Sequence, residues 1–272
     1  SIWSWRSSSR REGGPCRVRT GQEESAAGWG DCRGTVHPRV SLGRVIRKIR
    51  VAPSVLAADL GQLRSEMERV DSHVEMFHLD VMDGLYVPNL TFGAPVIEKV
   101  RPAVNAFFDC HLMVIEPLRL FEALAGAGAD HVTLHTDVCD DPTEAGSFAR
   151  RLGMGFGLAL SPALAPAVIR PHLAGLDMVT VMSVEPGFGG QAFMPETLSK
   201  VETIRRWIDD EELKTALQID GGITPETAPL AAAAGADIFV AGTAVFARAD
   251  PVEAVGMLRR SIHSAMSSAD GA

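Results

Sequence analysis

The chain has 272 residues, of which 46% are hydrophobic and 6% aromatic, and its formal net charge is −8. This length and composition suffice for one large domain with a mainly aliphatic core. The acidic balance argues against a nucleic-acid-binding protein, and the lack of any run of 18 apolar residues predicts no transmembrane helix.

The first part of the chain differs from the rest in its charge and in its pattern of apolar residues. Residues 1–50 hold 11 Lys and Arg against 4 Asp and Glu, whereas residues 51–272 hold 15 against 30. Residues 1–48 are rich in Ser, Arg and Gly and show no lasting apolar period, which predicts a disordered or non-native extension. A transit peptide is the alternative, but the four acidic residues argue against it.

From residue 49 onward, short apolar runs alternate with stretches of helical character. The runs predict eight strands, at 51–56, 76–81, 106–114, 131–135, 155–160, 178–182, 216–219 and 238–241. Helices are predicted at 60–70, 117–127, 195–208 and 225–234, three of them starting at a proline, Pro117, Pro195 or Pro225. The sequence Ala-Gly-Ala-Asp occurs at 127–130 and 234–237, where glycine is expected to end a helix before a strand.

Eight strands alternating with helices over about 220 residues predict a single (β/α)8 TIM barrel domain, at residues 49–268. An open doubly wound sheet is the alternative architecture. That fold usually carries a Gly-rich turn after its first strand, and Ala57, Ala58 and Asp59 stand there instead.

Polar side chains gather at the predicted carboxyl ends of strands, where barrel enzymes carry their chemistry. His78 and Asp80 share one face of the second strand because strand side chains alternate; His111 ends the third strand and Asp220 the seventh. Two His and two Asp can hold one divalent metal ion, and Zn, Fe(II), Mn and Co all suit such ligands. The alternative is that each residue only hydrogen-bonds its own loop. His131 and His135, on the fourth strand, are predicted to support the site or the structure without being ligands.

Glycines crowd the loops that follow the last three strands. They occur in the segment Glu185–Gln191, in Gly221-Gly222 and before Thr243 at Gly242. Glycine lets backbone N–H groups approach an anion closely, and the last loops of a barrel are its usual phosphate site. These loops therefore predict phosphate binding, mainly by backbone amides.

Six motifs together resemble the ribulose-phosphate 3-epimerase family, in the order expected for it. They are PSVL at 53–56, HLDVMDG at 78–84, HLMV at 111–114, VEPGFGGQ at 184–191, DGGI at 220–223 and AGT at 241–243. The resemblance covers residues 51–262, and the two longest motifs are the most specific. Ala57 and Ser183 depart from residues common in the family, and neither is a proposed ligand.

The resemblance implies a barrel enzyme of the pentose phosphate pathway that interconverts D-ribulose 5-phosphate and D-xylulose 5-phosphate through an enediolate at C3. His78, Asp80, His111 and Asp220 match metal ligands, and Asp80 and Asp220 match the acid/base pair. The implied substrate contacts are Ser54, His111, Met82, Met113, Met182, Gly187, Phe188, Gly189, Gly190, Gly221, Gly222, Gly242 and Thr243. One divalent metal, no organic cofactor and a homo-oligomer, either a dimer or a hexamer, are also implied. The partner is a small sugar phosphate, and neither a nucleic acid nor a membrane.

Three other functions compete with this interpretation. A hexulose-6-phosphate 3-epimerase would use the same chemistry on a longer sugar. A lyase or decarboxylase on a related barrel would place Lys near the acids, and none stands beside Asp80 or Asp220. A non-catalytic sugar-phosphate binding protein predicts loss of one of these acids. The four cysteines form no CxxC pair, which predicts a reducing, cytoplasmic location.

Overall fold

In the computed structural model, residues 49–269 are described, and they contain a (β/α)8 barrel. The extension predicted for residues 1–48 lies outside the described residues. The strands run in chain order as β1 (Arg50–Pro53), β2 (Met76–Met82), β3 (Phe107–Met113), β4 (His131–His135), β5 (Gly155–Leu160), β6 (Met178–Met182), β7 (Ala216–Asp220) and β8 (Ile238–Ala241). The predicted fold class is therefore confirmed.

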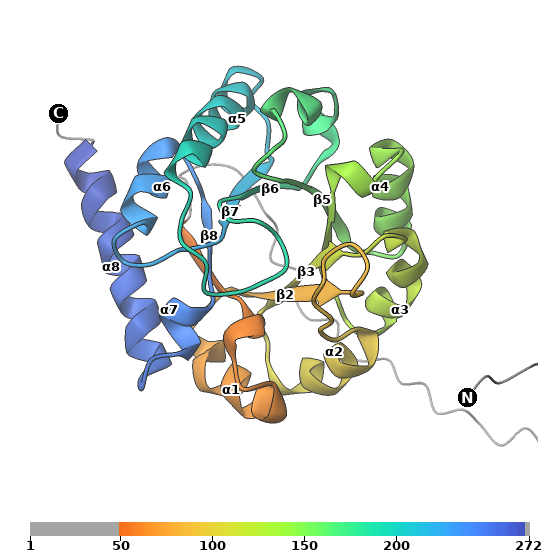
Figure 1. Cartoon of the computed structure of the whole chain (residues 1–272), viewed down its shortest axis with the longest axis horizontal. Helices are drawn as coiled ribbons and strands as arrows, with labels where there is room; N and C mark the ends of the chain where they lie inside the picture. Colours follow the sequence, from red (N-terminus) through yellow and green to blue (C-terminus); the bar gives the residue numbers. More distant parts are fainter. Residues whose placement is uncertain (1–48, 270–272) are drawn as a thin grey trace, which may run out of the picture. The chain divides into compact units, whose positions relative to one another are not determined.

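The strands form one parallel sheet that curls into a ring with the helices outside it (Figure 1). Neighbours in the sheet follow the order β1-β8-β7-β6-β5-β4-β3-β2, each pair joined by a parallel ladder. Within the described residues, β1 and β2 meet through an isolated parallel bridge between Ser54 and His78 instead of a ladder. The ring is thus nearly closed, and this junction is its least hydrogen-bonded one.

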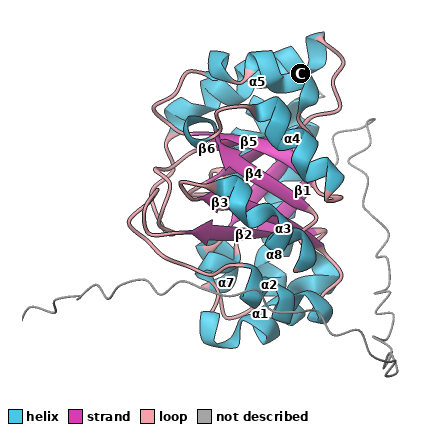
Figure 2. Cartoon of the chain, turned by 90° about the vertical axis from the view of Figure 1, so that its right-hand side faces the viewer, coloured by secondary structure: helices cyan, strands magenta, loops and turns pink. Residues whose placement is uncertain are grey.

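The helices cover the outer face of the sheet, as the side view in Figure 2 also shows. They are α1 (Leu63–Val70), α2 (Ala94–Val100), α3 (Phe121–Gly126), α4 (Pro142–Arg151), α5 (Leu198–Asp210), α6 (Ala228–Ala234), α7 (Thr243–Phe246) and α8 (Pro251–Ala269). Two 3-10 helices, Pro166–Val168 and Arg170–Gly175, replace an α-helix between β5 and β6. Prolines recur in this short segment, and each removes an N–H that an α-helix would use. No described helix is both long and apolar enough to cross a membrane.

Two predicted boundaries are wrong by three residues each. The first strand ends at Pro53, because the Ser54 side chain accepts a hydrogen bond from the Leu56 N–H and starts a 3-10 turn. The helix expected from Pro225 begins at Ala228, after a turn in which the Thr227 hydroxyl accepts from the backbone N–H of Thr224. The predicted glycine stops are confirmed, since Gly128 and Gly235 have φ of 93° and 110°.

Strand side chains alternate between two environments. Phe77, Leu79 and Val81 of β2 pack in the aliphatic layer between the sheet and the helices. The alternate residues point into the barrel, where the layer at the amino ends of the strands is apolar and includes Met76 and Met178. Towards the carboxyl ends the interior becomes polar, and that change positions the site described next.

Candidate active site

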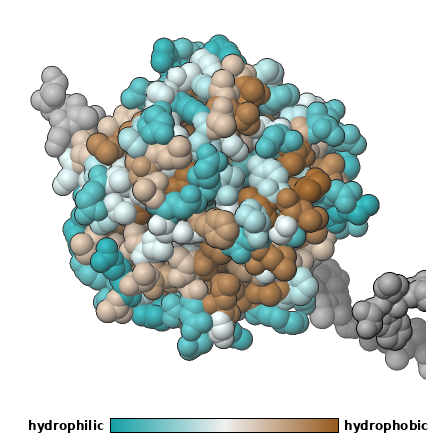
Figure 3. Space-filling model, in the orientation of Figure 1, coloured by the Kyte–Doolittle hydropathy of each residue, from teal (hydrophilic) through white to brown (hydrophobic). Residues whose placement is uncertain are grey.

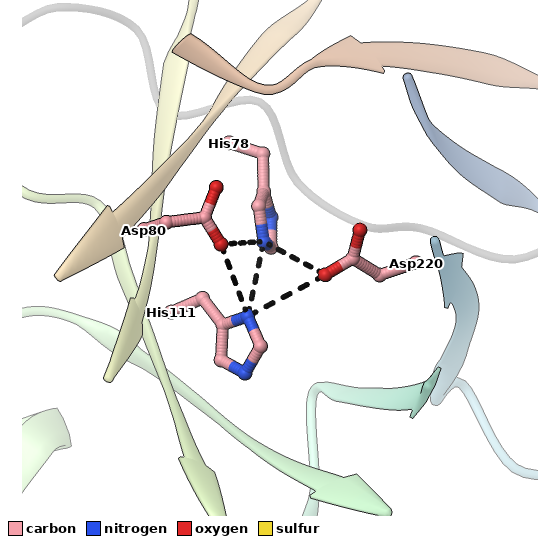
Figure 4. Close-up of side chains that lie close together, drawn as sticks. All are labelled: His78, Asp80, His111 and Asp220. Carbon is pink, nitrogen blue, oxygen red and sulfur yellow. Dashed lines mark hydrogen bonds and ion pairs between the residues drawn. The ribbon is translucent and has the colours of Figure 1, made fainter. Parts of the chain in front are cut away.

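Four side chains from three strands converge at the carboxyl ends of the strands (Figure 4). His78 and Asp80 come from β2, His111 from β3 and Asp220 from the end of β7. One ligand-type atom from each lies within 4.8 Å of the other three. The sequence prediction placed these residues on three separate strand ends, and the fold brings all four together.

The atoms that face one another are two imidazole nitrogens and two carboxylate oxygens. His78 Nε2 lies 3.2 Å from His111 Nδ1. Asp80 Oδ1 lies 3.4 and 3.5 Å from these two nitrogens, and Asp220 Oδ2 lies 3.6 Å from each of them. A mixed set of two nitrogens and two oxygens fits a divalent ion of the Zn, Fe(II), Mn or Co type. The residues present therefore fit one divalent metal ion.

In this cluster the pKa of each of three side chains is shifted by its neighbours. Burial disfavours the protonated form of His78, but Asp80 and Asp109 together raise its pKa well above the ordinary value. Burial acts the same way on His111, whose pKa is nevertheless raised by Asp220 and Asp80. Burial also opposes ionisation of Asp80, yet His78 and His111 hold the pKa of its carboxyl well below the usual range. The two rings thus attract positive charge, either as protons or as a cation that would compete with those protons.

A cavity of about 320 Å³ opens beside the cluster. Asp80, Asp220 and Ser54 line it, and the Ser54 hydroxyl donates a 2.6 Å hydrogen bond to Asp80 Oδ2. His78 and His111 are fully buried behind these residues, so His111, which was also predicted to contact the substrate, does not line the cavity. The remaining predicted substrate contacts all line the cavity: Met82, Met113, Met182, Gly187, Phe188, Gly189, Gly190, Gly221, Gly222, Gly242 and Thr243.

Two loops meet over this cavity. The Asn89 side chain, in the loop after β2, donates to the carbonyl of Gly187 in the loop after β6. Gly187 has φ of 120°, and a Cβ built there would lie 3.0 Å from Val87 Cβ. Glycine is therefore required for both the backbone conformation and the close approach of the loops.

The rim of the mouth supplies little positive charge. In the loop after β2, Leu85 and Leu90 are 74% and 73% exposed. Figure 3 shows apolar side chains gathered mainly in the lower half of the face that carries the mouth. Among the described residues that line the cavity, none is Lys or Arg, so an anion bound here would meet only backbone N–H groups and neutral side chains such as that of Thr243.

The two departures from the family pattern are compatible with the site. Ala57 lines the cavity, and its Cβ would lie 3.0 Å from a Cβ placed on Gly242. The buried Ser183 hydroxyl lies 2.7 Å from the carbonyl oxygen of Gly221 and 3.0 Å from that of Asp220. These hydrogen bonds hold the Ser183 side chain against the end of β7, which carries Asp220 of the cluster.

Sequence reasoning missed the residues beneath the cluster. Asp109, on β3, is fully buried and hydrogen-bonds His78, His131 and Gln218. It precedes His111 by two positions and so shares its face of the strand, a signal present in the sequence. His135 contacts His111 of the cluster, whereas His131 contacts Asp109, which in turn contacts His78. The supporting role expected of both histidines stays a prediction.

A family model and the relatives similar in sequence agree on one family. Residues 50–246 match the model of the family described as Ribulose-phosphate 3 epimerase. A ribulose-phosphate 3-epimerase of Mycobacterium leprae is 47% identical over 213 residues, covering 77% of this chain and 93% of that protein. The Bacillus subtilis protein of the same name is 40% identical over 215 residues, covering 78% and 99%.

Among solved structures, a 3-hexulose-6-phosphate synthase aligns with a TM-score of 0.57 at 22% identity, covering 79% of this chain and 99% of that one. An orotidine 5'-phosphate decarboxylase from Pyrococcus horikoshii aligns with the same TM-score at 17% identity, covering 78% and 99%. At these identities the likeness concerns the fold alone.

Proposed function

The chain belongs to the ribulose-phosphate 3-epimerase family and is an isomerase, and from this premise we propose that it interconverts D-ribulose 5-phosphate and D-xylulose 5-phosphate. The observation that carries the proposal is the meeting of Asp80 and Asp220 in one cluster, although they come from β2 and β7. Inverting a carbon next to a ketone requires two acid/base groups that reach opposite faces of the same carbon.

The two carboxyl groups divide the proton transfer at C3 between them. One removes the C3 proton and leaves a planar enediolate, and the other returns a proton to the opposite face. One group must therefore begin ionised and the other protonated. The depressed pKa of Asp80 favours its ionised form, and its hydrogen bond from Ser54 fixes the orientation of the carboxylate.

The other lining residues hold the substrate in register. Met82, Met113 and Met182 give the reacting carbons an apolar wall without acidic protons that could compete. The loops at Gly187–Gly190, Gly221–Gly222 and Gly242–Thr243 would bind the phosphate through backbone N–H groups. Anchoring the phosphate away from C3 lowers the entropic cost of placing C3 between the acids.

We further propose that His78, Asp80, His111 and Asp220 hold one divalent cation, with no organic cofactor. Such a cation would supply positive charge against the negative charge that develops on the substrate when the proton leaves. The homo-oligomer, the cytoplasmic location and the place in the pentose phosphate pathway stay predictions. The names of the relatives favour the pentulose over the hexulose substrate.

The test is NMR of D-ribulose 5-phosphate in deuterated water with purified protein loaded with Zn, Fe(II), Mn or Co in turn. We expect D-xylulose 5-phosphate to appear, with deuterium entering at C3. Neither product nor exchange with any of the four metals would contradict the pentulose assignment. The same assay with a hexulose 6-phosphate distinguishes a longer substrate from a protein that only binds sugar phosphates.

A further inference from the structure

The barrel interior directly beneath the cluster holds a buried anion that the proposed reaction does not use. Asp109 is fully buried. Its Oδ2 lies 2.8 Å from His78 Nδ1 and accepts from Gln218 Nε2 at 2.9 Å, while its Oδ1 lies 3.0 Å from His131 Nδ1. An ionised carboxyl is costly to bury without partners, and the partners of Asp109 include His78 of the cluster.

The backbone of β5 is shaped to accommodate this arrangement. A Cβ at Gly155 would lie 2.6 Å from His131 Cδ2, and one at Gly157 would lie 2.8 Å from His131 Cε1. Both glycines therefore make room for the ring that binds the far oxygen of Asp109. The polar layer beneath the cluster thus depends on residues of β3, β4, β5 and β7.

The second histidine of the cluster has a partner of a different kind. His111 Nε2 lies 2.9 Å from His135 Nε2, and the two rings stack with centroids 4.9 Å apart. His135 Nδ1 lies 3.1 Å from the Ser161 hydroxyl oxygen. His135 therefore presents one ring nitrogen to His111 and the other to a hydroxyl that carries no charge.

These contacts allow one consistent assignment of ring protons when both cluster histidines present lone pairs inward. His78 then carries its proton on Nδ1, donated to Asp109, and offers Nε2 to the cluster. His111 carries its proton on Nε2, donated to His135, and offers Nδ1. His135 in turn donates from Nδ1 to Ser161. Each ring nitrogen of His78, His111 and His135 then either donates a proton or offers a lone pair.

We propose that Asp109 and His135 are positioning residues that fix the tautomers of His78 and His111, and that their difference in charge makes the two ligands unequal. The anionic Asp109 strengthens His78 as an electron donor, whereas the neutral His135 leaves His111 the weaker one. This inference rests on the proposed cation site and concerns the affinity of that site for the cation. It assigns the buried carboxylate to metal affinity and leaves the proton transfer to Asp80 and Asp220.

The first test is the zinc affinity of the full chain, measured by competition with a chromogenic chelator. Asp109→Asn keeps the shape of the side chain but removes the charge, and we expect it to weaken zinc binding by about 10- to 100-fold. His135→Gln should have a smaller effect in the same direction. The control is Asp130→Asn, whose carboxylate accepts from the Phe108 N–H and Arg101 but contacts no cluster residue. It should keep wild-type zinc affinity even if its melting temperature falls.

The second measurement needs no variant that could fail to fold. In zinc-loaded, ¹⁵N-labelled wild-type protein, long-range proton–nitrogen NMR correlations report which ring nitrogen carries the proton. We expect Nδ1–H for His78 and Nε2–H for His111. The opposite tautomer of His78, or wild-type zinc affinity in Asp109→Asn, overturns the inference while leaving the proposed function standing. Failure of the wild-type chain to bind zinc, Fe(II), Mn or Co would overturn both.

Discussion

At the scale of single residues, the acid/base pair gives the most direct prediction. Asp220→Asn keeps the size of the side chain but cannot accept or return a proton, so kcat/KM should fall by about 100- to 10,000-fold. The loss is measured with D-ribulose 5-phosphate under metal saturation. The control is Asp177→Asn, in the loop before β6 at the opposite end of the barrel, where the carboxylate accepts from the Phe156 N–H. Unchanged turnover in Asp220→Asn would remove that residue from the mechanism.

A second residue-scale prediction concerns the half-buried Cys139. Burial, together with Asp140 and Asp141 beside it, raises the pKa of the thiol to about 11. Because only the thiolate is alkylated, the rate of its reaction with iodoacetamide should be low at neutral pH and rise about tenfold per pH unit. Peptide mass spectrometry follows this cysteine separately from the others. Alkylation at pH 7.5 as fast as that of free cysteine would contradict the expected pKa.

The sequence was sufficient to predict the four cluster residues but not the residues beneath them. Strand alternation and strand ends are local properties, and they place His78, Asp80, His111 and Asp220 at the mouth. The contact between Asp109 and Gln218 joins positions 109 residues apart. It depends on how β3 and β7 face each other across the barrel, which a one-dimensional pattern does not specify.

At the scale of elements, seven of the eight predicted strands agree with the structure to within one residue at each end, because buried parallel strands are marked by continuous apolar runs. The errors arose where local side-chain chemistry overrode the pattern. The Ser54 hydroxyl ended β1 early, and the turn held by Thr224 and Thr227 delayed α6. In both places a hydroxyl offered the backbone an alternative hydrogen bond.

An element-scale prediction follows from the loop after β7. Gly222 has φ of 62°, and a Cβ there would lie 2.6 Å from the backbone nitrogen of Phe193. Gly222→Ala should therefore lower the free energy of unfolding by about 1–3 kcal/mol, since neither backbone can move freely. Urea denaturation measures the change.

The matched control for this change lies in the same cavity. Gly189 has no positive φ, and nothing lies within 4 Å of a Cβ built on it. Gly189→Ala should shift the unfolding midpoint much less than Gly222→Ala. Equal shifts in the two variants would show that the strain is not located at Gly222.

At the scale of the whole molecule, the catalytic unit is predicted to be independent of residues 1–48. The family match spans residues 50–246, and every residue lining the cavity falls within it. Deleting residues 1–48 should therefore leave kcat/KM within about twofold of the full chain, as is common for terminal segments outside a domain. A large loss of turnover, with the melting temperature unchanged, would show that this segment contributes to the enzyme.

The junction between β1 and β2 couples closure of the strand ring to ligand binding in the cavity at its mouth. In the described chain these strands share only the Ser54–His78 bridge, reinforced by the hydrogen bond from Ser54 to Asp80. Local opening there would expose two unpaired strand edges to solvent. Any molecule that binds across Ser54, Asp80 and Asp220 binds only when the two edges are held together. Occupancy and ring closure are therefore linked thermodynamically, and substrate binding should slow amide hydrogen exchange along β1 and β2.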